Sequence, residues 1–312
     1  MPHLGFREWK ELFVQTAKDW SEDKVPRLGA AMAFYTALSM APLLVIALRV
    51  AAYFFGDEAA AGEIERQAQA MIGKDGAEAL QAMIENADEE KSGTIAAVLG
   101  IVTLLFGASG VFGQLQDSMN TIWEVQPKPG RGIWGFVRDR FLSFAMVMGC
   151  AFLLLVSLVV TTMLSAAMSF TQQFGDNFGW LATLLNEGVS LLVITGIFAV
   201  TFKMVPDVKI AWRDVWIGAV ITALLFAIGK FGLSMYLSRS SMASSYGVAG
   251  SLIVLLVWVY YSAQIVFFGA EFTQVYANKY GSRIVPSENA IPVTEEARAQ
   301  QGMPSPQRMS PA

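Results

Sequence analysis

Four side chains, three of them able to donate or accept hydrogen bonds, recur within the apolar stretch of residues 244–276. Tyr261, Gln264, Phe268 and Glu271 follow one another at intervals of three, four and three residues, which places them on one face of an α-helix. A hydroxyl or amide group in hydrocarbon costs a few kcal/mol unless a partner satisfies it. We therefore expect this face to contact protein or a wet cavity rather than lipid. Two interpretations stay open: a substrate-binding stripe, or hydrogen bonds that join neighbouring helices.

Three ionisable residues, Arg49, Glu187 and Lys230, lie within other apolar stretches. Charged side chains inside a membrane usually pair with one another or contact water. One hypothesis is a single outward-facing cavity with an excess of positive charge, which would suit an anionic head group such as a lipid phosphate. The alternative is that the two long cationic side chains reach outward to the lipid head groups and that Glu187 pairs with one of them.

The composition indicates a membrane protein without catalytic or metal-binding residues. Of 312 residues, 54% are hydrophobic and only 15% are charged, whereas a soluble domain has roughly a quarter charged residues. The single histidine, His3, leaves no histidine for a metal site or a Ser-His dyad in the body of the chain. The net charge of -4 argues against a nucleic-acid partner. We expect no cofactor and no metal.

Six apolar stretches predict six transmembrane helices, at about residues 29–55, 92–107, 141–164, 180–202, 212–237 and 244–276. Residues 57–92 carry two short apolar stripes around a Gly-Lys-Asp-Gly break, which predicts a helical hairpin outside the membrane. The predicted fold class is all-α: a polytopic membrane protein with a six-transmembrane-helix bundle, an extracytoplasmic helical hairpin and an N-terminal interfacial helix.

The two ends of the chain differ from the membrane domain of residues 29–283. Residues 1–28 predict an amphipathic helix with aromatic residues near one side, which lies either in the membrane interface or against its own protein. Residues 284–312 have few large apolar side chains and predict a disordered tail. Most of the 22 Lys and Arg residues flank the spans on one side, which places both termini in the cytoplasm.

Four segments together resemble one known family. They are AMAFYTALSMAPLL at residues 31–44, QDSMNTIWEV at 116–125, VPDVKIAWRDVWIGA at 205–219 and SYGVAGSLIVLLVWVYYSAQIVFFGAEFT at 245–273. Their order and spacing are similar to those of the YihY/BrkB family of bacterial inner-membrane proteins, once labelled ribonuclease BN. The resemblance implies a six-helix protein of the inner membrane. We expect no nuclease, because the acidic residues of the cytoplasmic loops are scattered rather than clustered.

Two functions remain as hypotheses. The first is transport or flipping of an anionic lipid or another envelope component, with Arg49, Glu187, Lys230 and the polar stripe of the last span as substrate-binding residues. The second is a scaffold or anchor for an envelope protein partner. A weaker third hypothesis is an ion-coupled carrier with Glu271 or Glu187 as proton acceptor. Membrane lipids are expected partners in each case.

Overall fold

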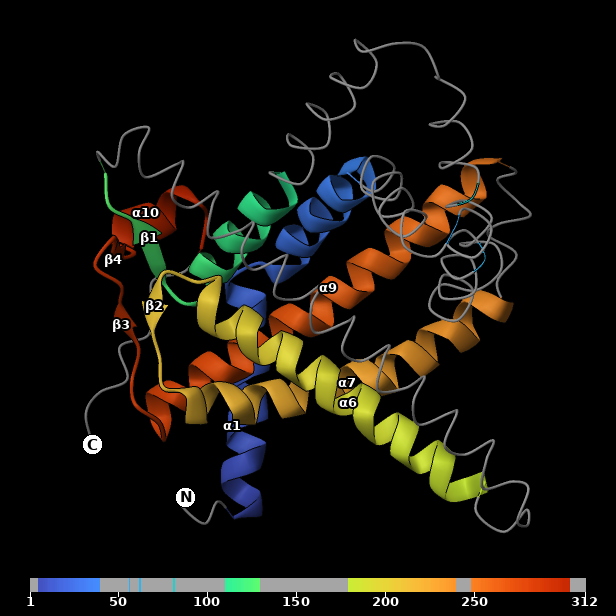
Figure 1. Ribbon diagram of the computed structural model, residues 1–312. Coiled ribbons are helices and arrows are strands. Elements are labelled where there is room, and N and C mark those ends of the chain that lie inside the picture. The colour runs from blue at the N-terminus through green and yellow to red at the C-terminus, as the bar shows by residue number, and fades with distance from the viewer. Residues whose placement is uncertain are drawn as a thin grey trace. The chain divides into compact units, whose positions relative to one another are not determined.

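The computed structural model describes residues 5–39, 56, 62, 81, 110–129, 179–239 and 248–303. This part of the chain is mostly helical (Figure 1). Two helical stretches, residues 25–39 and 110–122, carry no label. The labelled elements are α1 (Phe6–Glu22), β1 (Val125–Pro127), α6 (Gly179–Met204), β2 (Val208–Lys209), α7 (Trp212–Arg239), α9 (Val248–Lys279), β3 (Val285–Pro286), β4 (Ala290–Pro292) and α10 (Glu295–Gln300).

The chain divides into two compact units. The first unit comprises residues 1–23, 119–227 and 268–312, and the second comprises residues 24–118 and 228–267. Both α7 and α9 cross the boundary, so each of these long helices contributes one segment to each unit.

Three described helices are long and apolar enough to cross a membrane. The apolar parts are Glu187–Met204 of α6, Trp212–Leu233 of α7 and Leu252–Lys279 of α9. They coincide with the fourth, fifth and sixth predicted spans. The second and third predicted spans, most of the first and nearly all of the predicted hairpin at 57–92 lie outside the described residues, so the count of six remains a prediction.

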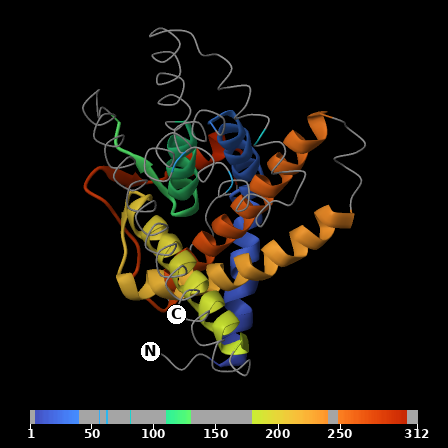
Figure 2. The ribbon, with the colours of Figure 1, turned by 45° about the vertical axis from the view of Figure 1, so that its right-hand side comes forward.

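Helix α1 packs along one side against α7 and α9 in the first unit. Leu12 is fully buried with Phe272 and other residues of α9, and the ring of Trp9 stacks on Phe272 with centroids 6.1 Å apart. On another side, Phe6 and Val14 are 86% and 59% exposed. The axis of α1 runs crosswise to the first part of α7 (Figures 1 and 2). One side of α1 therefore packs on its own protein, while another leaves apolar groups uncovered.

The structure corrects the predicted disorder for much of residues 284–312. Strand β4 pairs antiparallel with β1, and β3 pairs antiparallel with β2, so two small sheets also depart from the all-α prediction. The backbone groups of this segment find hydrogen-bond partners more than 70 residues away in the sequence; for example, Ser287 N–H donates to Asp207 O at 2.8 Å. Local composition does not reveal such long-range pairing. Residues 304–312 lie outside the described residues.

Helices α7 and α9 cross closely in the first unit because glycine on each helix faces threonine on the other. A Cβ atom added to Gly218 would collide with the Thr273 side chain, and one added to Gly269 would collide with Thr222. Each threonine hydroxyl donates to the glycine carbonyl four residues earlier on its own helix, at 2.7 Å for Thr222 and 2.6 Å for Thr273. The hydroxyls are thereby satisfied, and the backbones can approach closely.

The crossing gives a test by substitution. We expect Gly218→Ala and Gly269→Ala each to destabilise the protein by about 1–3 kcal/mol, because the added methyl group overpacks the contact. Gly196→Ala in α6 is the matched control, since a Cβ atom added there would have no described atom within 4 Å; it should be neutral or stabilising by up to about 1 kcal/mol. Thermal unfolding in detergent measures all three. Equal unfolding temperatures for the three variants would contradict the close crossing.

Candidate functional site

The buried guanidinium of Arg298 is the centre of an ion-pair cluster in the first unit, in which Asp23 is buried and the Glu124 side chain is 41% exposed. Its Nη2 donates to Asp23 Oδ1 at 2.8 Å, and its Nη1 donates to Glu124 Oε1 at 3.2 Å. Arg298 and Asp23 are each 3% exposed. We call Asp23, Glu124 and Arg298 the Arg298 cluster. It joins three segments that are far apart in the sequence.

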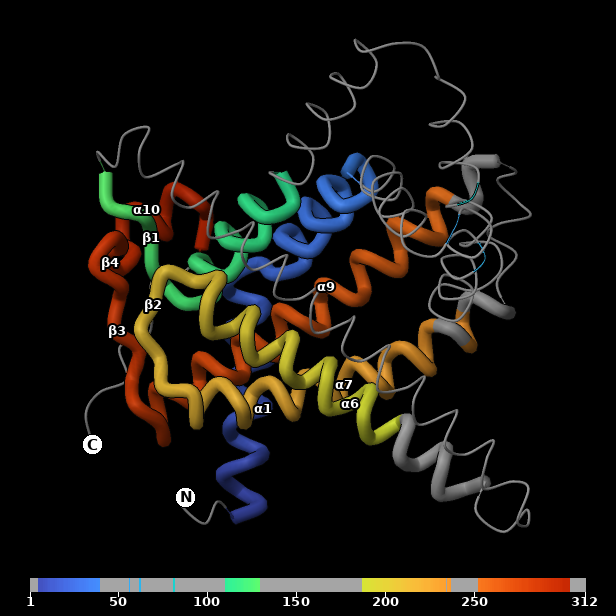
Figure 3. Tube along the Cα trace, viewed as in Figure 1, coloured from blue at the N-terminus to red at the C-terminus, as the bar shows by residue number. Residues whose placement is uncertain are grey.

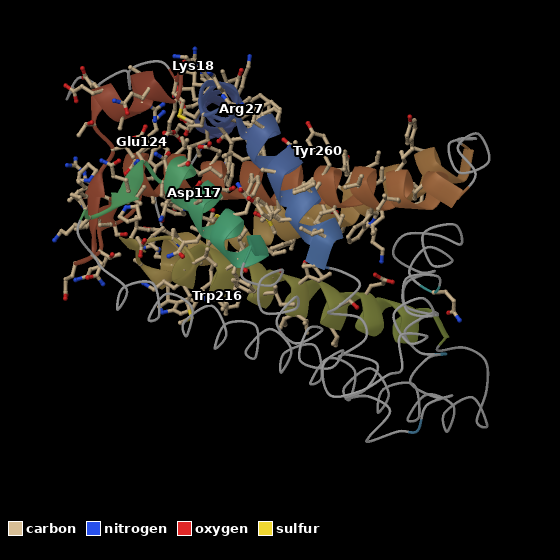
Figure 4. All side chains as sticks on the ribbon, turned by 90° about the horizontal axis from the view of Figure 1, so that it is seen from above. Lys18, Arg27, Asp117, Glu124, Trp216 and Tyr260 are labelled. Carbon is tan, nitrogen blue, oxygen red and sulfur yellow. The ribbon has the colours of Figure 1, made fainter. Side chains whose placement is uncertain are left out.

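Local backbone geometry positions each member of the cluster. Asp23 is the residue that ends α1. Glu124 follows the helix of residues 110–122 with φ of 54°, a left-handed conformation that is uncommon outside glycine. Helix α10 begins after Thr294, whose Oγ1 accepts the Ala297 N–H at 3.2 Å. Figure 4 shows Glu124 on the side of the green helix that faces α10. The turn at Glu124 and the capped start of α10 thus bring the charges together.

Glu271 of α9 is a buried carboxyl group in the same unit. It is 0% exposed, and neither carboxylate oxygen has a hydrogen-bond partner among the described residues. The charges that act on it are those of Asp23, Asp19, Glu124 and Arg298. Near Glu271 there are thus three other acidic side chains and one guanidinium, that of Arg298, so acidic groups are in excess.

Burial raises the pKa of the Asp23 carboxyl to about 7, and the negative charges of Glu124 and Asp19 add to this effect. The positive charge and hydrogen bond of Arg298 oppose it without overcoming it. The pKa of Asp19 is also raised, chiefly by burial. The Arg298 cluster consequently contains a group that titrates near neutral pH.

The other members of the predicted stripe lie at different depths on α9. In the second unit, the Gln264 amide is buried without a hydrogen-bond partner among the described residues. It rests against Gly29, where an added Cβ atom would collide with Gln264 Nε2. Tyr261 is 39% exposed and borders Gly229. In the first unit, Phe268 is half-buried. The stripe thus has two buried polar members, Gln264 and Glu271, and one exposed hydroxyl-bearing ring.

The described residues do not test the cavity predicted for Arg49, Glu187 and Lys230. Arg49 lies outside them. Glu187, on α6, is exposed and belongs to the first unit, whereas Lys230, on α7, is exposed and belongs to the second. The shared cavity of these residues stays a hypothesis. Among the described residues, no three His, Cys, Asp or Glu side chains form a group that could hold a metal ion.

Two of the four sequence segments that carry the family resemblance contact each other directly. Asn120 Nδ2 donates to Asp207 Oδ2 at 3.1 Å, and Asp207 N–H donates to Asn120 Oδ1 at 2.8 Å. Asp207 lies between the end of α6 and the start of β2. The segment that joins α6 to α7 through β2 can be followed in Figure 3. Asp214 Oδ2 accepts the Ser282 N–H at 2.7 Å and the Ser282 hydroxyl at 2.8 Å. Both carboxylates therefore have structural roles in joining the helix ends.

Sequence reasoning missed the Arg298 cluster. The sequence analysis assigned no role to Asp23 or Glu124, and Arg298 fell in the predicted disordered tail. One local signal was present: Thr294 followed by two glutamates and an alanine-rich turn is typical of a helix start. The pairing of Arg298 with two distant acidic residues has no local signature.

The long apolar helices and the buried polar groups on them define an integral membrane protein. The chain belongs to the virulence factor BrkB family, whose model matches residues 16–292. A UPF0761 membrane protein of Alteromonas mediterranea is 25% identical over 290 residues, which is 89% of this chain and 94% of that protein. The UPF0761 membrane protein of Pseudoalteromonas translucida is 25% identical over 258 residues, 81% of each chain.

A further relative carries a different kind of name. The ribonuclease-like protein YfkH of Bacillus subtilis is 25% identical over 285 residues, which is 90% of this chain and 98% of that protein. No solved structure gives a significant match to the chain. The relatives confirm the resemblance to the YihY/BrkB family.

The ion pairs give a test of the C-terminal segment. Arg298→Gln should release residues 285–300, because it removes both ion pairs and leaves the buried carboxyl group of Asp23 without the hydrogen bond that Arg298 donates, a loss of about 1–3 kcal/mol. Glu288→Gln is the control, since it breaks the exposed Lys209–Glu288 pair (3.1 Å), and an exposed pair contributes about 0–1 kcal/mol. Limited proteolysis of the C-terminal segment measures the release. Equal cleavage rates in both variants would show that Arg298 does not hold the segment.

The raised pKa of Asp23 predicts a pH dependence. The folded protein holds a proton on Asp23 up to about pH 7, whereas the unfolded chain loses it near the ordinary value of 3.8. The contribution of Asp23 to stability therefore falls as pH rises from about 4 to about 7 and is constant above that. Asp23→Asn should make stability depend less on pH between about pH 4 and pH 7.

Unfolding temperatures from pH 5 to pH 8 in wild type, Asp23→Asn and Glu288→Gln measure this effect. The Glu288→Gln profile should follow that of wild type. The assignment is wrong if Asp23→Asn has the same slope as the other two proteins.

Proposed function

We propose that this protein moves an anionic amphiphile, such as a phospholipid, across the bacterial inner membrane, with both termini in the cytoplasm. The observation that carries the proposal is the pair of buried polar groups on α9. The Gln264 amide and the Glu271 carboxyl lack hydrogen-bond partners among the described residues, although α9 is a candidate membrane span.

A purely structural role for the helix bundle explains buried polar groups without partners less well than a transport pathway does. Native proteins satisfy nearly all buried polar atoms, because a buried group without a partner costs about 1–3 kcal/mol. The close crossing at Gly218 and Gly269 is a contrast, because both threonine hydroxyls there donate to a backbone carbonyl. Polar groups inside membrane spans commonly mark the pathways of substrates or ions. Gln264 and Glu271 therefore support a pathway along α9.

The chemistry of the groups favours a polar head group over an apolar cargo. The Gln264 amide can donate two hydrogen bonds to phosphate oxygens. Lys230, exposed on α7, supplies a positive charge for an anion. Glu271 is suited to exchange a proton or a cation during the cycle, which would couple movement to an ion gradient. The activity is proposed to be non-enzymatic, so the ribonuclease-like name of the Bacillus subtilis relative is not extended to this chain.

A reconstitution experiment tests the proposal. Purified protein is placed in vesicles containing a trace of fluorescent phosphatidylglycerol, and dithionite quenching reports lipid that reaches the outer leaflet. Wild type should accelerate this exchange. Gln264→Ala and Glu271→Gln should slow it about tenfold or more, the effect of one lost hydrogen bond to a charged group. Lys230→Gln should also slow it.

Glu288→Gln is the matched control, because it removes a carboxylate from an exposed pair outside the spans. It should leave exchange unchanged. Exchange no faster than in protein-free vesicles, with or without an imposed proton gradient, would contradict transport and favour the scaffold hypothesis. Undiminished exchange in both α9 variants would contradict the role of the buried groups.

A further inference from the structure

A groove lies between the N-terminal part of α1 and the end of α9, within the first unit. Its volume is about 640 Å³, within the roughly 300–1,000 Å³ of a small-molecule site. The lining combines charged and apolar side chains, among them Phe6, Arg7, Lys10, Glu11, Val14 and Lys279. This groove is separate from the Arg298 cluster and from the polar stripe of α9.

The charges of the groove favour an anion. Arg7, Lys10 and Lys279 contribute three positive charges against the one negative charge of Glu11. Lys279 Nζ contacts Glu11 Oε2 at 2.8 Å, so this pair is neutral as a whole. Arg7 and Lys10 are exposed and form no ion pair with any described residue. The excess of two positive charges is therefore located on α1.

The apolar side chains of the groove favour an amphiphile over a free anion. Phe6 and Val14, at its rim, are 86% and 59% exposed, and such surface is unfavourable in water. Helix α1 runs crosswise to the first part of α7 (Figures 1 and 2). Because α7 contains a candidate span, this direction suits a helix along the membrane surface, where apolar groups enter the acyl-chain boundary.

We infer that this groove binds an anionic phospholipid of the cytoplasmic leaflet. Arg7 and Lys10 hold the phosphate, Lys279 borders the head group, and Phe6 and Val14 contact the first part of the acyl chains. Basic residues beside a span attract anionic head groups in this way. The site goes beyond the proposed transport function, because it requires binding only.

Native mass spectrometry of the delipidated full-length protein tests the site. The probes are dioleoyl phosphatidylglycerol and dioleoyl phosphatidylcholine. Wild type should bind the phosphatidylglycerol more tightly. The double variant Arg7→Gln/Lys10→Gln should bind it about 10- to 30-fold more weakly, the effect of two lost surface charges. Because both side chains are exposed, the variant should keep the wild-type unfolding temperature.

Lys18→Gln/Lys209→Gln is the matched control. It removes the same number of charges from side chains that are 42% and 61% exposed and do not line the groove, and it should bind like wild type. Equal weakening by both double variants would overturn the site in favour of diffuse attraction. Equal binding of the two lipids, or unchanged binding by Arg7→Gln/Lys10→Gln, would also overturn it.

Two further measurements distinguish this lipid site from a site for a soluble phosphate and from the transport pathway on α9. Millimolar glycerol 3-phosphate should not displace the lipid, because it lacks the acyl chains that contact Phe6 and Val14; complete displacement would identify a soluble phosphate ligand instead. Glu271→Gln should bind phosphatidylglycerol at this groove as wild type does, since Glu271 does not line it. In Glu271→Gln, lost transport with unchanged phosphatidylglycerol binding is therefore the result that both proposals predict. Weakened binding in that variant would place the bound lipid on α9 rather than in the groove and would overturn the groove, without contradicting transport.

Discussion

A charged or polar side chain in a low-dielectric environment needs a partner, and this constraint organises the first unit. Arg298 is almost completely buried, and its guanidinium contacts the carboxylates of Asp23 and Glu124. Those contacts tie the end of α1, the turn before β1 and helix α10 to one point. Replacing such a pair with apolar side chains often costs nothing, but removing one partner costs much. The cluster therefore specifies which segments meet, whatever its net contribution to stability.

Helix α9 combines two kinds of environment along its length. At Gly269 and Thr273 it packs tightly against α7, and the polar atoms there are satisfied. At Gln264 and Glu271 it carries buried polar groups without partners among the described residues. Tight packing fixes the position of the helix, and the unpartnered groups retain the capacity to bind something else. A transport pathway needs both properties in one element.

The sequence predicted the elements whose signal is local. Long apolar runs predicted α6, α7 and α9. The helical spacing of the stripe predicted that its members face protein or a wet cavity; the Gln264 amide and the Glu271 carboxyl are buried in the structure, whereas Tyr261 is 39% exposed. The ordered segment at 285–303 was not predicted, because its stability comes from pairing with β1, β2 and Asp23 rather than from its own composition. The amphipathic helix at the N-terminus was predicted from its own residues. The groove lined by Arg7 and Lys10 was not predicted, because side chains of α9 form part of it. The roles of Arg49, Glu187 and Lys230 remain predictions.

The central claim is that the buried polar groups of α9 face protein or water rather than acyl chains. Spin labels at single cysteines along α9, in a Cys150→Ala background in lipid vesicles, measure this directly through collisions with dissolved oxygen, which concentrates in the hydrocarbon. Labels at Gln264→Cys and Glu271→Cys should show low oxygen access, and a label at Leu252→Cys, where the native side chain is 40% exposed, should show high access. Oxygen access at positions 264 and 271 equal to or above that at position 252 would contradict the account.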